Sequence, residues 1–127
     1  MKRSLGFTLI ELLLSVSIIA ILSARARDSQ RLSDLRKVQG ALEMYFADHR
    51  SYPVSNGWEE LTSIQDDMTG YLSTLPSGVR DGEAYMYNSD GSSYQLLAEM
   101  ETENSANGNC FDYGGFTPSL CYGVTNP

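Results

Sequence analysis

An apolar run of 18 residues, Phe7 to Ala24, lies near the start of the chain and has the sequence FTLIELLLSVSIIAILSA. The basic residues Lys2 and Arg3 precede the run, and Arg25 ends it. As an α-helix, a segment of this length extends about 27 Å, close to the hydrocarbon thickness of a bilayer, which is roughly 30 Å. We therefore expect residues 7–24 to form a helix that crosses a membrane.

A single carboxylate, Glu11, interrupts this run close to its start. An acidic side chain at the centre of a membrane-spanning helix costs about 2.5 to 3.5 kcal/mol on insertion scales, and less near an end. Thr8, Glu11 and Ser15 share one helical face because they are spaced at i, i+3 and i+7. The sequence therefore predicts that Glu11 meets a cation on a partner helix.

The residues around Glu11 resemble a known pattern. The stretch Gly6-Phe7-Thr8-Leu9-Ile10-Glu11, behind a short basic leader, is similar to the class III signal of type IV prepilins and of type II secretion pseudopilins. The resemblance implies that a membrane prepilin peptidase removes the leader, residues 1–6, by cleavage between Gly6 and Phe7. It implies methylation of the new Phe7 amine. It also implies that Glu11 offsets the N-terminal amine of a neighbouring subunit, with Phe7 and Thr8 as further assembly residues.

Members of this family are filament subunits that polymerise through their N-terminal helices. The resemblance therefore implies a homo-oligomeric filament with other pilin subunits, together with the prepilin peptidase and an inner-membrane assembly platform with its ATPase. It places the chain in the cytoplasmic membrane as a single-pass protein before assembly, and in an extracellular or cell-surface filament afterwards. The expected function is structural and not enzymatic. Major pilin, minor pilin and pseudopilin all remain open.

An ordinary secretory signal peptide is the alternative interpretation of the N-terminus. The basic pair, the apolar run and the stretch Ala24-Arg25-Ala26 fit such a peptide with cleavage after Ala26, which would release a soluble binding module. Against this, the apolar run is longer than the usual 7 to 15 residues, and Glu11 would be a defect in a signal peptide. Five basic residues follow the run and two precede it, so the positive-inside rule alone predicts the reverse orientation. The motif favours a leader in the cytoplasm.

A polar segment, residues 25–52, continues the helix in amphipathic form. Its larger side chains recur every three or four residues, which is the spacing of one helical face. We expect the helix to end near His49, before Pro53, and this face to cover the head. The residues that define the face are Leu32, Leu35, Val38, Leu42, Tyr45 and His49.

The remaining segment, residues 53–127, predicts a globular head with a small antiparallel sheet. Asn56 and Glu59 resemble a capping box that starts a short helix, with Trp58, Leu61, Ile64 and Met68 on one face. Residues 84–88 and 93–100 are predicted to form a hairpin around the turn Asp90-Gly91. The predicted fold class is α+β and pilin-like: a long transmembrane and amphipathic helix packed on a small antiparallel β-sheet head.

The tail, residues 101–127, is rich in Gly, Asn, Ser and Thr, and we expect it to be irregular. Cys110 and Cys121 lie in it, and a disulfide between them is expected in an exported chain, although two free thiols remain open. A closed loop of about 12 residues would stabilise the head by roughly 2.5 to 3 kcal/mol. Four aromatic residues of the tail are expected to pack onto the hairpin or to face a partner: Phe111, Tyr113, Phe116 and Tyr122.

Charge and composition exclude several other functions. Residues 51–127 contain eleven acidic residues and only Arg80 as a base, so no nucleic-acid binding is expected. The one histidine, His49, has no recognisable catalytic partners, and its place near a helix end suggests a surface group. No cofactor is expected. Calcium stays open without a recognisable ligand spacing, with these candidate carboxylates: Asp81, Glu83, Asp90 and Asp112.

Overall fold

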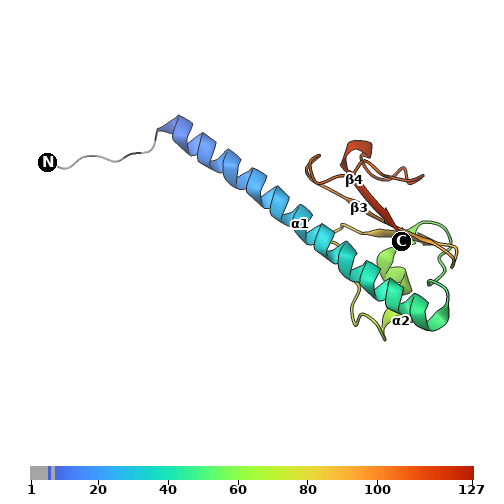
Figure 1. Ribbon diagram of the computed structural model, residues 1–127. Coiled ribbons are helices and arrows are strands. Elements are labelled where there is room, and N and C mark those ends of the chain that lie inside the picture. The colour runs from blue at the N-terminus through green and yellow to red at the C-terminus, as the bar shows by residue number, and fades with distance from the viewer. Residues whose placement is uncertain (1–5, 7) are drawn as a thin grey trace.

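One long helix dominates the molecule, whose computed structural model describes residues 6 and 8–127. The helix α1 spans Leu9–His49, so the continuous helix expected from the sequence is confirmed from Leu9 onward. Residues 9–39 contain neither glycine nor proline, so nothing interrupts the backbone hydrogen bonds where the sequence changes from apolar to polar. The N-terminal half of α1 projects alone, and its C-terminal half lies against the head (Figure 1).

The C-terminal end of α1 agrees with the predicted stop before Pro53. Arg50 adopts a left-handed backbone with φ of 59°, and its N–H donates a hydrogen bond of 2.8 Å to the carbonyl of Phe46. His49 is the last helical residue and is exposed, as predicted, and its ring stacks on that of Tyr45 with centroids 4.0 Å apart. A histidine there also suits the negative end of the helix dipole.

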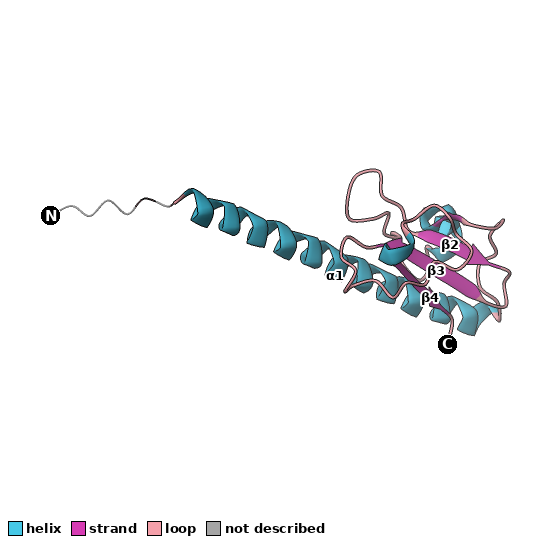
Figure 2. Ribbon diagram, turned by 90° about the horizontal axis from the view of Figure 1, so that it is seen from above, coloured by secondary structure: helices cyan, strands magenta, loops and turns pink. Residues whose placement is uncertain are grey.

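Four antiparallel strands form the sheet of the head, in the order β1-β2-β3-β4. β1 is Glu59–Glu60, β2 is Met86–Ser89, β3 is Tyr94–Glu99 and β4 is Cys121–Thr125. The strands lie alongside the second half of α1 (Figure 2). The α+β fold class is therefore confirmed, and the core between helix and sheet consists mainly of Leu35, Val38, Ala41 and Leu42 from α1 and of Tyr85, Tyr87, Tyr94, Leu96, Ala98 and Met100 from the sheet side.

The hairpin predicted from the sequence is present as β2 and β3. Its register pairs Met86 with Leu97 and Ser89 with Tyr94. The connecting turn includes Gly91 at φ of 92°, a conformation that glycine adopts without strain. The turn is held by Asp90, whose Oδ1 accepts the backbone N–H groups of residues 92 and 93 at 2.9 Å each.

The helix predicted to start after Asn56 begins later, so that prediction is wrong in its first turn. Glu59 does accept the Asn56 N–H at 3.3 Å, as a capping box requires, but Glu59 and Glu60 pair with β2 as the short strand β1. Pairing with β2 decides the conformation there, and the Leu61 N–H donates to the Tyr85 carbonyl at 2.8 Å. Helical structure then follows as the 3₁₀ turn η1, Leu61–Ile64, and the short helix α2, Gln65–Met68.

The tail is more ordered than the sequence indicated. It contains the 3₁₀ turn η2, Pro118–Leu120, and the edge strand β4, which were not predicted. The disulfide between Cys110 and Cys121 is confirmed, with the two Cα atoms 5.2 Å apart. The strand β4 could not be predicted because it is short and contains Gly123, and glycine is uncommon in strand interiors.

The loop closed by this disulfide contacts both Trp58 and β4. Trp58, which was expected on a helical face, instead contacts this loop: its ring lies 6.0 Å from that of Phe111 and 5.5 Å from that of Tyr113. The Trp58 Nε1–H donates to Oδ1 of Asp112 at 2.6 Å. A Cβ atom at Gly123 would collide with the Asn109 carbonyl oxygen and the Phe111 ring. The loop therefore packs directly against β4 through a position without a side chain.

This close approach predicts that Gly123→Ala destabilises the head by about 1 to 3 kcal/mol, the usual cost of overpacking. Denaturant unfolding in detergent, followed by the fluorescence of Trp58, would measure the change. Gly114→Ala is the matched control, since a Cβ at Gly114 meets nothing within 4 Å and its stability should stay close to that of the parent chain. Equal stability of all three proteins would contradict this packing.

Candidate assembly helix and its junction with the head

The N-terminal half of α1 exposes almost all of its large apolar side chains. Their exposed fractions run from 53% at Ile21 to 77% at Leu9. The helix is long and apolar enough to cross a membrane, as its length and composition show. The ten side chains concerned are Leu9, Ile10, Leu12, Leu13, Leu14, Val16, Ile18, Ile19, Ile21 and Leu22.

The carboxylate of Glu11 closes the N-terminal end of this helix. Thr8 is the N-cap: its Oγ1 accepts the Glu11 N–H at 3.2 Å, and Glu11 Oε2 accepts the Thr8 N–H at 2.9 Å. This reciprocal capping box satisfies two backbone donors that a helix start otherwise leaves unpaired. Ser15, the third residue of the predicted polar face, donates its hydroxyl to the Glu11 carbonyl at 2.9 Å. These polar groups thus have partners within their own helix.

The cation predicted for Glu11 is not supplied by the described part of the chain. Among residues 6 and 8–127, Glu11 makes no ion pair. Phe7, whose amine the resemblance assigns as the site of methylation, lies outside the described residues, and Gly6 on the other side of the expected cleavage point is exposed. The carboxylate therefore stays available for a positive charge from outside the described residues.

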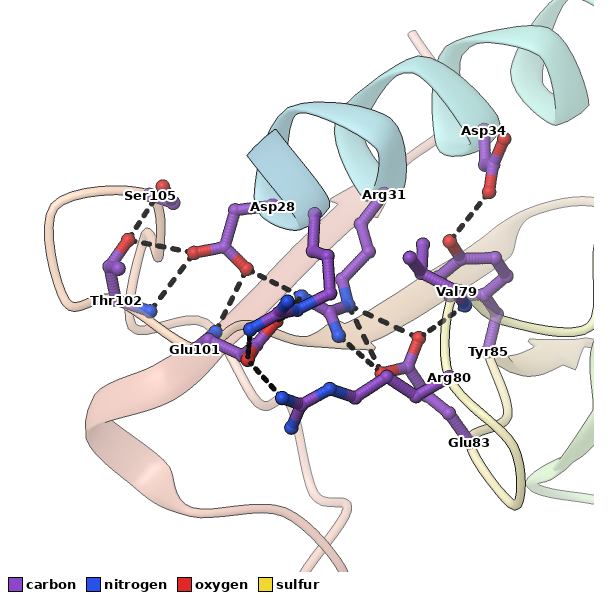
Figure 3. Close-up of polar contacts among 11 residues, drawn as sticks. Asp28, Arg31, Asp34, Val79, Arg80, Glu83, Tyr85, Glu101, Thr102 and Ser105 are labelled. Carbon is purple, nitrogen blue, oxygen red and sulfur yellow. Dashed lines mark hydrogen bonds and ion pairs between the residues drawn. The ribbon is translucent and has the colours of Figure 1, made fainter. Parts of the chain in front are cut away.

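A buried arginine joins α1 to the head where the apolar half of the helix gives way to the covered half (Figure 3). Arg31 is 1% exposed, and its Nη1 lies 2.8 Å from Asp28 Oδ1 and 2.8 Å from Glu101 Oε2. Its Nη2 lies 2.5 Å from Glu83 Oε1. One guanidinium therefore links three carboxylates, of which one is on α1, one precedes β2 and one follows β3.

Asp28 fixes the loop after β3 directly. It is fully buried, and its two carboxylate oxygens accept the backbone N–H groups of Glu101 and Thr102 at 2.8 and 2.9 Å. It also accepts the Thr102 hydroxyl at 2.7 Å. Burial by itself would raise the pKa of Asp28, but these hydrogen bonds and the one from Arg31 outweigh it and leave the pKa lowered.

Glu101 forms ion pairs with three arginines at the surface side of the same cluster. Arg27 binds it through Nε at 2.6 Å and Nη2 at 2.7 Å, and Arg80 Nη2 lies 3.1 Å away. The hydrogen bond from Arg27, followed by the bond from Arg31, lowers the pKa of Glu101 to about 2. For Glu83, burial acts in the opposite direction, but the bond from Arg31 prevails and the pKa is lowered. Three arginines thus balance three carboxylates, so the junction is close to neutral.

A second polar contact lies one turn further along α1. The Tyr85 hydroxyl donates to Asp34 Oδ2 at 2.7 Å, and both residues are buried. Burial and then the hydrogen bond to Asp34 raise the pKa of Tyr85. This contact connects the helix to the start of β2 and adds to the fixed orientation of α1 against the sheet.

Three of the four carboxylates considered for calcium are engaged in separate contacts. Glu83 binds Arg31, Asp90 holds its own turn and Asp112 accepts from Trp58. Within the part of the chain that the structure describes, no group of three or more metal-ligating side chains occurs. The only one of these residues at the junction is Glu83, and its role there is to pair with arginine.

The arginine junction was not predicted from the sequence. In the sequence, Arg31 is simply one of the five basic residues that follow the span. A signal was present, because residues 28, 31, 35, 38 and 42 fall on one helical face and continue the apolar stripe. Charged residues in register with a core stripe are buried when carboxylates and bases are available to pair with one another.

Comparisons with known proteins agree with the resemblance inferred from the N-terminal motif. Residues 1–24 match the family model of the prokaryotic N-terminal methylation motif. The chain is similar to the type II secretion system core protein G of Escherichia coli (strain K12), with 27% identity over a region that covers 78% of this chain and 86% of that protein. No solved structure matches the chain significantly. The resemblance to type IV prepilins and type II secretion pseudopilins is confirmed, and these findings support a pilin-like structural subunit.

The junction predicts that Arg31→Met destabilises the folded head by about 3 to 5 kcal/mol, because breaking a buried ion pair leaves uncompensated charge. Chemical unfolding in detergent with Trp58 fluorescence would measure the loss. Arg36→Met is the matched control, since Arg36 is an exposed arginine of the same helix, and its effect should stay within about 0.5 kcal/mol. Similar stability of the two variants would show that the junction contributes little.

Acid should weaken the same junction. The carboxyl pKa values of Asp28, Glu83 and Glu101 are lower in the folded chain than their ordinary values of 3.8, 4.5 and 4.5, so the unfolded chain takes up protons first as the pH falls. Stability is therefore complete above about pH 5 and falls progressively toward pH 2. Urea midpoints at several pH values should show this decline, with a shallower slope in Glu101→Gln. A midpoint that stays constant or rises toward pH 2 would contradict the prediction.

Proposed function

We propose that the chain is a structural subunit of a pseudopilus or type IV pilus, cleaved by a prepilin peptidase between Gly6 and Phe7, methylated at Phe7 and assembled through α1. The observation that carries this proposal is the projecting half of α1, whose apolar side chains the head leaves uncovered. A subunit of this shape has one end for burial in lipid or among neighbouring helices, and another end that remains in water.

Covering this half would release a large amount of free energy. Complete burial of ten large apolar side chains at about 1.5 to 3 kcal/mol each would gain up to roughly 15 to 30 kcal/mol. The head contributes none of this gain, because it leaves these side chains exposed. The helix therefore needs a membrane or a bundle of like helices around it, and a filament subunit has the first before assembly and the second afterwards.

The position of Glu11 suits both environments. Before assembly its carboxylate caps the helix start, which reduces the number of unpaired polar groups placed in lipid. Cleavage after Gly6 would create a charged amine at the residue just before Thr8. Opposite charges attract far more strongly in a dry helix bundle than in water, so the amine of a neighbouring subunit is a suitable partner for Glu11 once the helices stack.

The junction also bears on orientation in the membrane. Arg27 and Arg31 are two of the five basic residues that follow the span, and both bind carboxylates of the head. In the folded subunit they therefore carry little uncompensated charge across the membrane, so their number does not oppose an outward head. The proposed arrangement has the leader in the cytoplasm and the head outside.

Among filaments of this kind we favour a type II secretion pseudopilus. The similarity to core protein G extends over 78% of this chain, far beyond the N-terminal motif, and so includes part of the head. The proposed partners are further copies of the chain, the prepilin peptidase, and the membrane assembly platform with its ATPase. No substrate is turned over in this role.

Substitution of Glu11 tests the proposal and separates its two contributions. Glu11→Ala removes both the cap and the charge, whereas Glu11→Gln keeps an oxygen that can accept the Thr8 N–H and removes only the charge. Both variants should remain in the membrane and fail to form fibres, as seen by electron microscopy of material sheared from the cells. The matched control, Ser17→Ala, alters a hydroxyl that bonds only the Leu13 carbonyl of its own helix and should assemble normally.

Two results would count against the proposal. Normal fibres from Glu11→Ala would show that neither function of this side chain is needed for assembly. Fibres from Glu11→Gln but not from Glu11→Ala would show that the cap matters and the charge does not, which would exclude the charge pairing proposed here.

A further inference from the structure

We propose that subunits also contact one another outside the apolar core, through a basic stripe on α1 and an acidic shoulder on the head of a second copy. The basic stripe is the solvent-facing side of α1 formed by Ser29, Ser33, Arg36, Lys37 and Gly40. The acidic shoulder comprises Glu59, Glu60, Asp66 and Asp67 on β1 and α2. This inference rests on the proposed filament function and adds a specific contact to it.

The basic stripe is the side of α1 that the head does not cover. Leu35 and Val38 point into the core, whereas Arg36 and Lys37 are exposed, and a Cβ at Gly40 would meet nothing within 4 Å. Unlike Arg27 and Arg31, these two bases make no ion pair among residues 6 and 8–127. The small side chains beside them leave room for another subunit to approach the helix closely.

The acidic shoulder holds four carboxylates within nine residues. Glu60, Asp66 and Asp67 are exposed, and none of the four forms an ion pair in the described part of the chain. Glu59 accepts hydrogen bonds only from its own loop, from the Asn56 N–H and the Ser63 hydroxyl. The shoulder is therefore a surface of uncompensated negative charge on β1 and α2.

Charge complementarity selects a second copy as the partner. The chain has a net charge of -7, so identical heads brought together in a filament repel one another. Placing Arg36 and Lys37 of one subunit against the shoulder of the next would replace part of this repulsion by attraction and would also fix the register between them. The contact is heterologous, and repetition of a heterologous contact builds an open helical filament.

The stripe is also continuous with the surface that the proposed function already buries. Leu22, Ser29 and Arg36 are spaced seven residues apart and so lie on nearly the same face of α1. Neighbouring helices that cover Leu22 within a filament therefore bring protein close to Arg36. Arg36 lies about 18 Å beyond Ala24 along the helix, more than twice a Debye length of about 8 Å, which disfavours lipid headgroups as its partner.

A charge exchange in the full chain, expressed with its own assembly machinery, tests the contact. One variant reverses the stripe, Arg36→Glu with Lys37→Glu, a second reverses the shoulder, Asp66→Lys with Asp67→Lys, and a third combines both. Each single reversal should reduce sheared fibres at least about tenfold, because like charges placed together cost more than 1.4 kcal/mol per contact. The combined variant should recover to within about threefold of the parent chain.

The controls use exposed charges that belong to neither surface. Arg50→Glu lies beyond the end of α1, and Glu103→Lys lies in the tail, so both should assemble at the parent level. Membrane content and Trp58 fluorescence of each variant would confirm that the heads are folded. These measurements show that lost fibres reflect lost contact between subunits.

The results separate this inference from the filament function on which it rests. Loss of fibres in Glu11→Ala, together with normal fibres in both reversals, would overturn the docking contact and leave the filament intact. Loss in both reversals without recovery in the combined variant would also overturn it, since the stripe would then face another partner such as anionic lipid. Absence of fibres from the parent chain would overturn the filament function itself, and the contact with it.

Discussion

The structure depends on one unbroken helix that lies in two different environments. No residue between Leu9 and Gln39 permits an easy break, so the apolar half and the covered half of α1 are mechanically one rod. The apolar N-terminal half of α1 is not stable when fully exposed to water. The sheet buries apolar side chains only of the C-terminal half. The head therefore leaves the apolar half of α1 uncovered, and a membrane or the helices of neighbouring subunits would have to cover it.

The arginine junction makes this rod and the head move together. Arg31 and Asp28 stand on α1, whereas their partners Glu83 and Glu101 lie on two separate segments of the head. A guanidinium is well suited to this position because its planar fork can bind several carboxylates in fixed directions. A head held in this way cannot pivot freely on its helix, so the position of each helix in a bundle also determines where the head surface lies. In the proposed filament, this coupling would let a contact between heads and helices influence assembly.

Much of this arrangement follows from the sequence, and what does not has physical reasons. The apolar run, the Glu11 motif and the stripe from Leu35 to Leu42 depend on local spacing, which a single chain displays directly. The strands β1 and β4 depend instead on pairing with distant residues: Glu59 and Glu60 show no strand pattern, and β4 contains Gly123. The arginine junction could not be predicted for the same reason. Glu83 and Glu101 lie more than fifty residues from Arg31 in the sequence, and nothing local indicates that they contact it.

We infer that the apolar half of α1 is kept in the mature protein because the assembled filament covers it. Intact-mass measurement and N-terminal sequencing of the mature chain, recovered from sheared fibres and from the membrane, would test this inference. A filament subunit should begin at Phe7 and carry one methyl group on its amine. A mature chain that begins at Arg27 and is released as a soluble protein would contradict it.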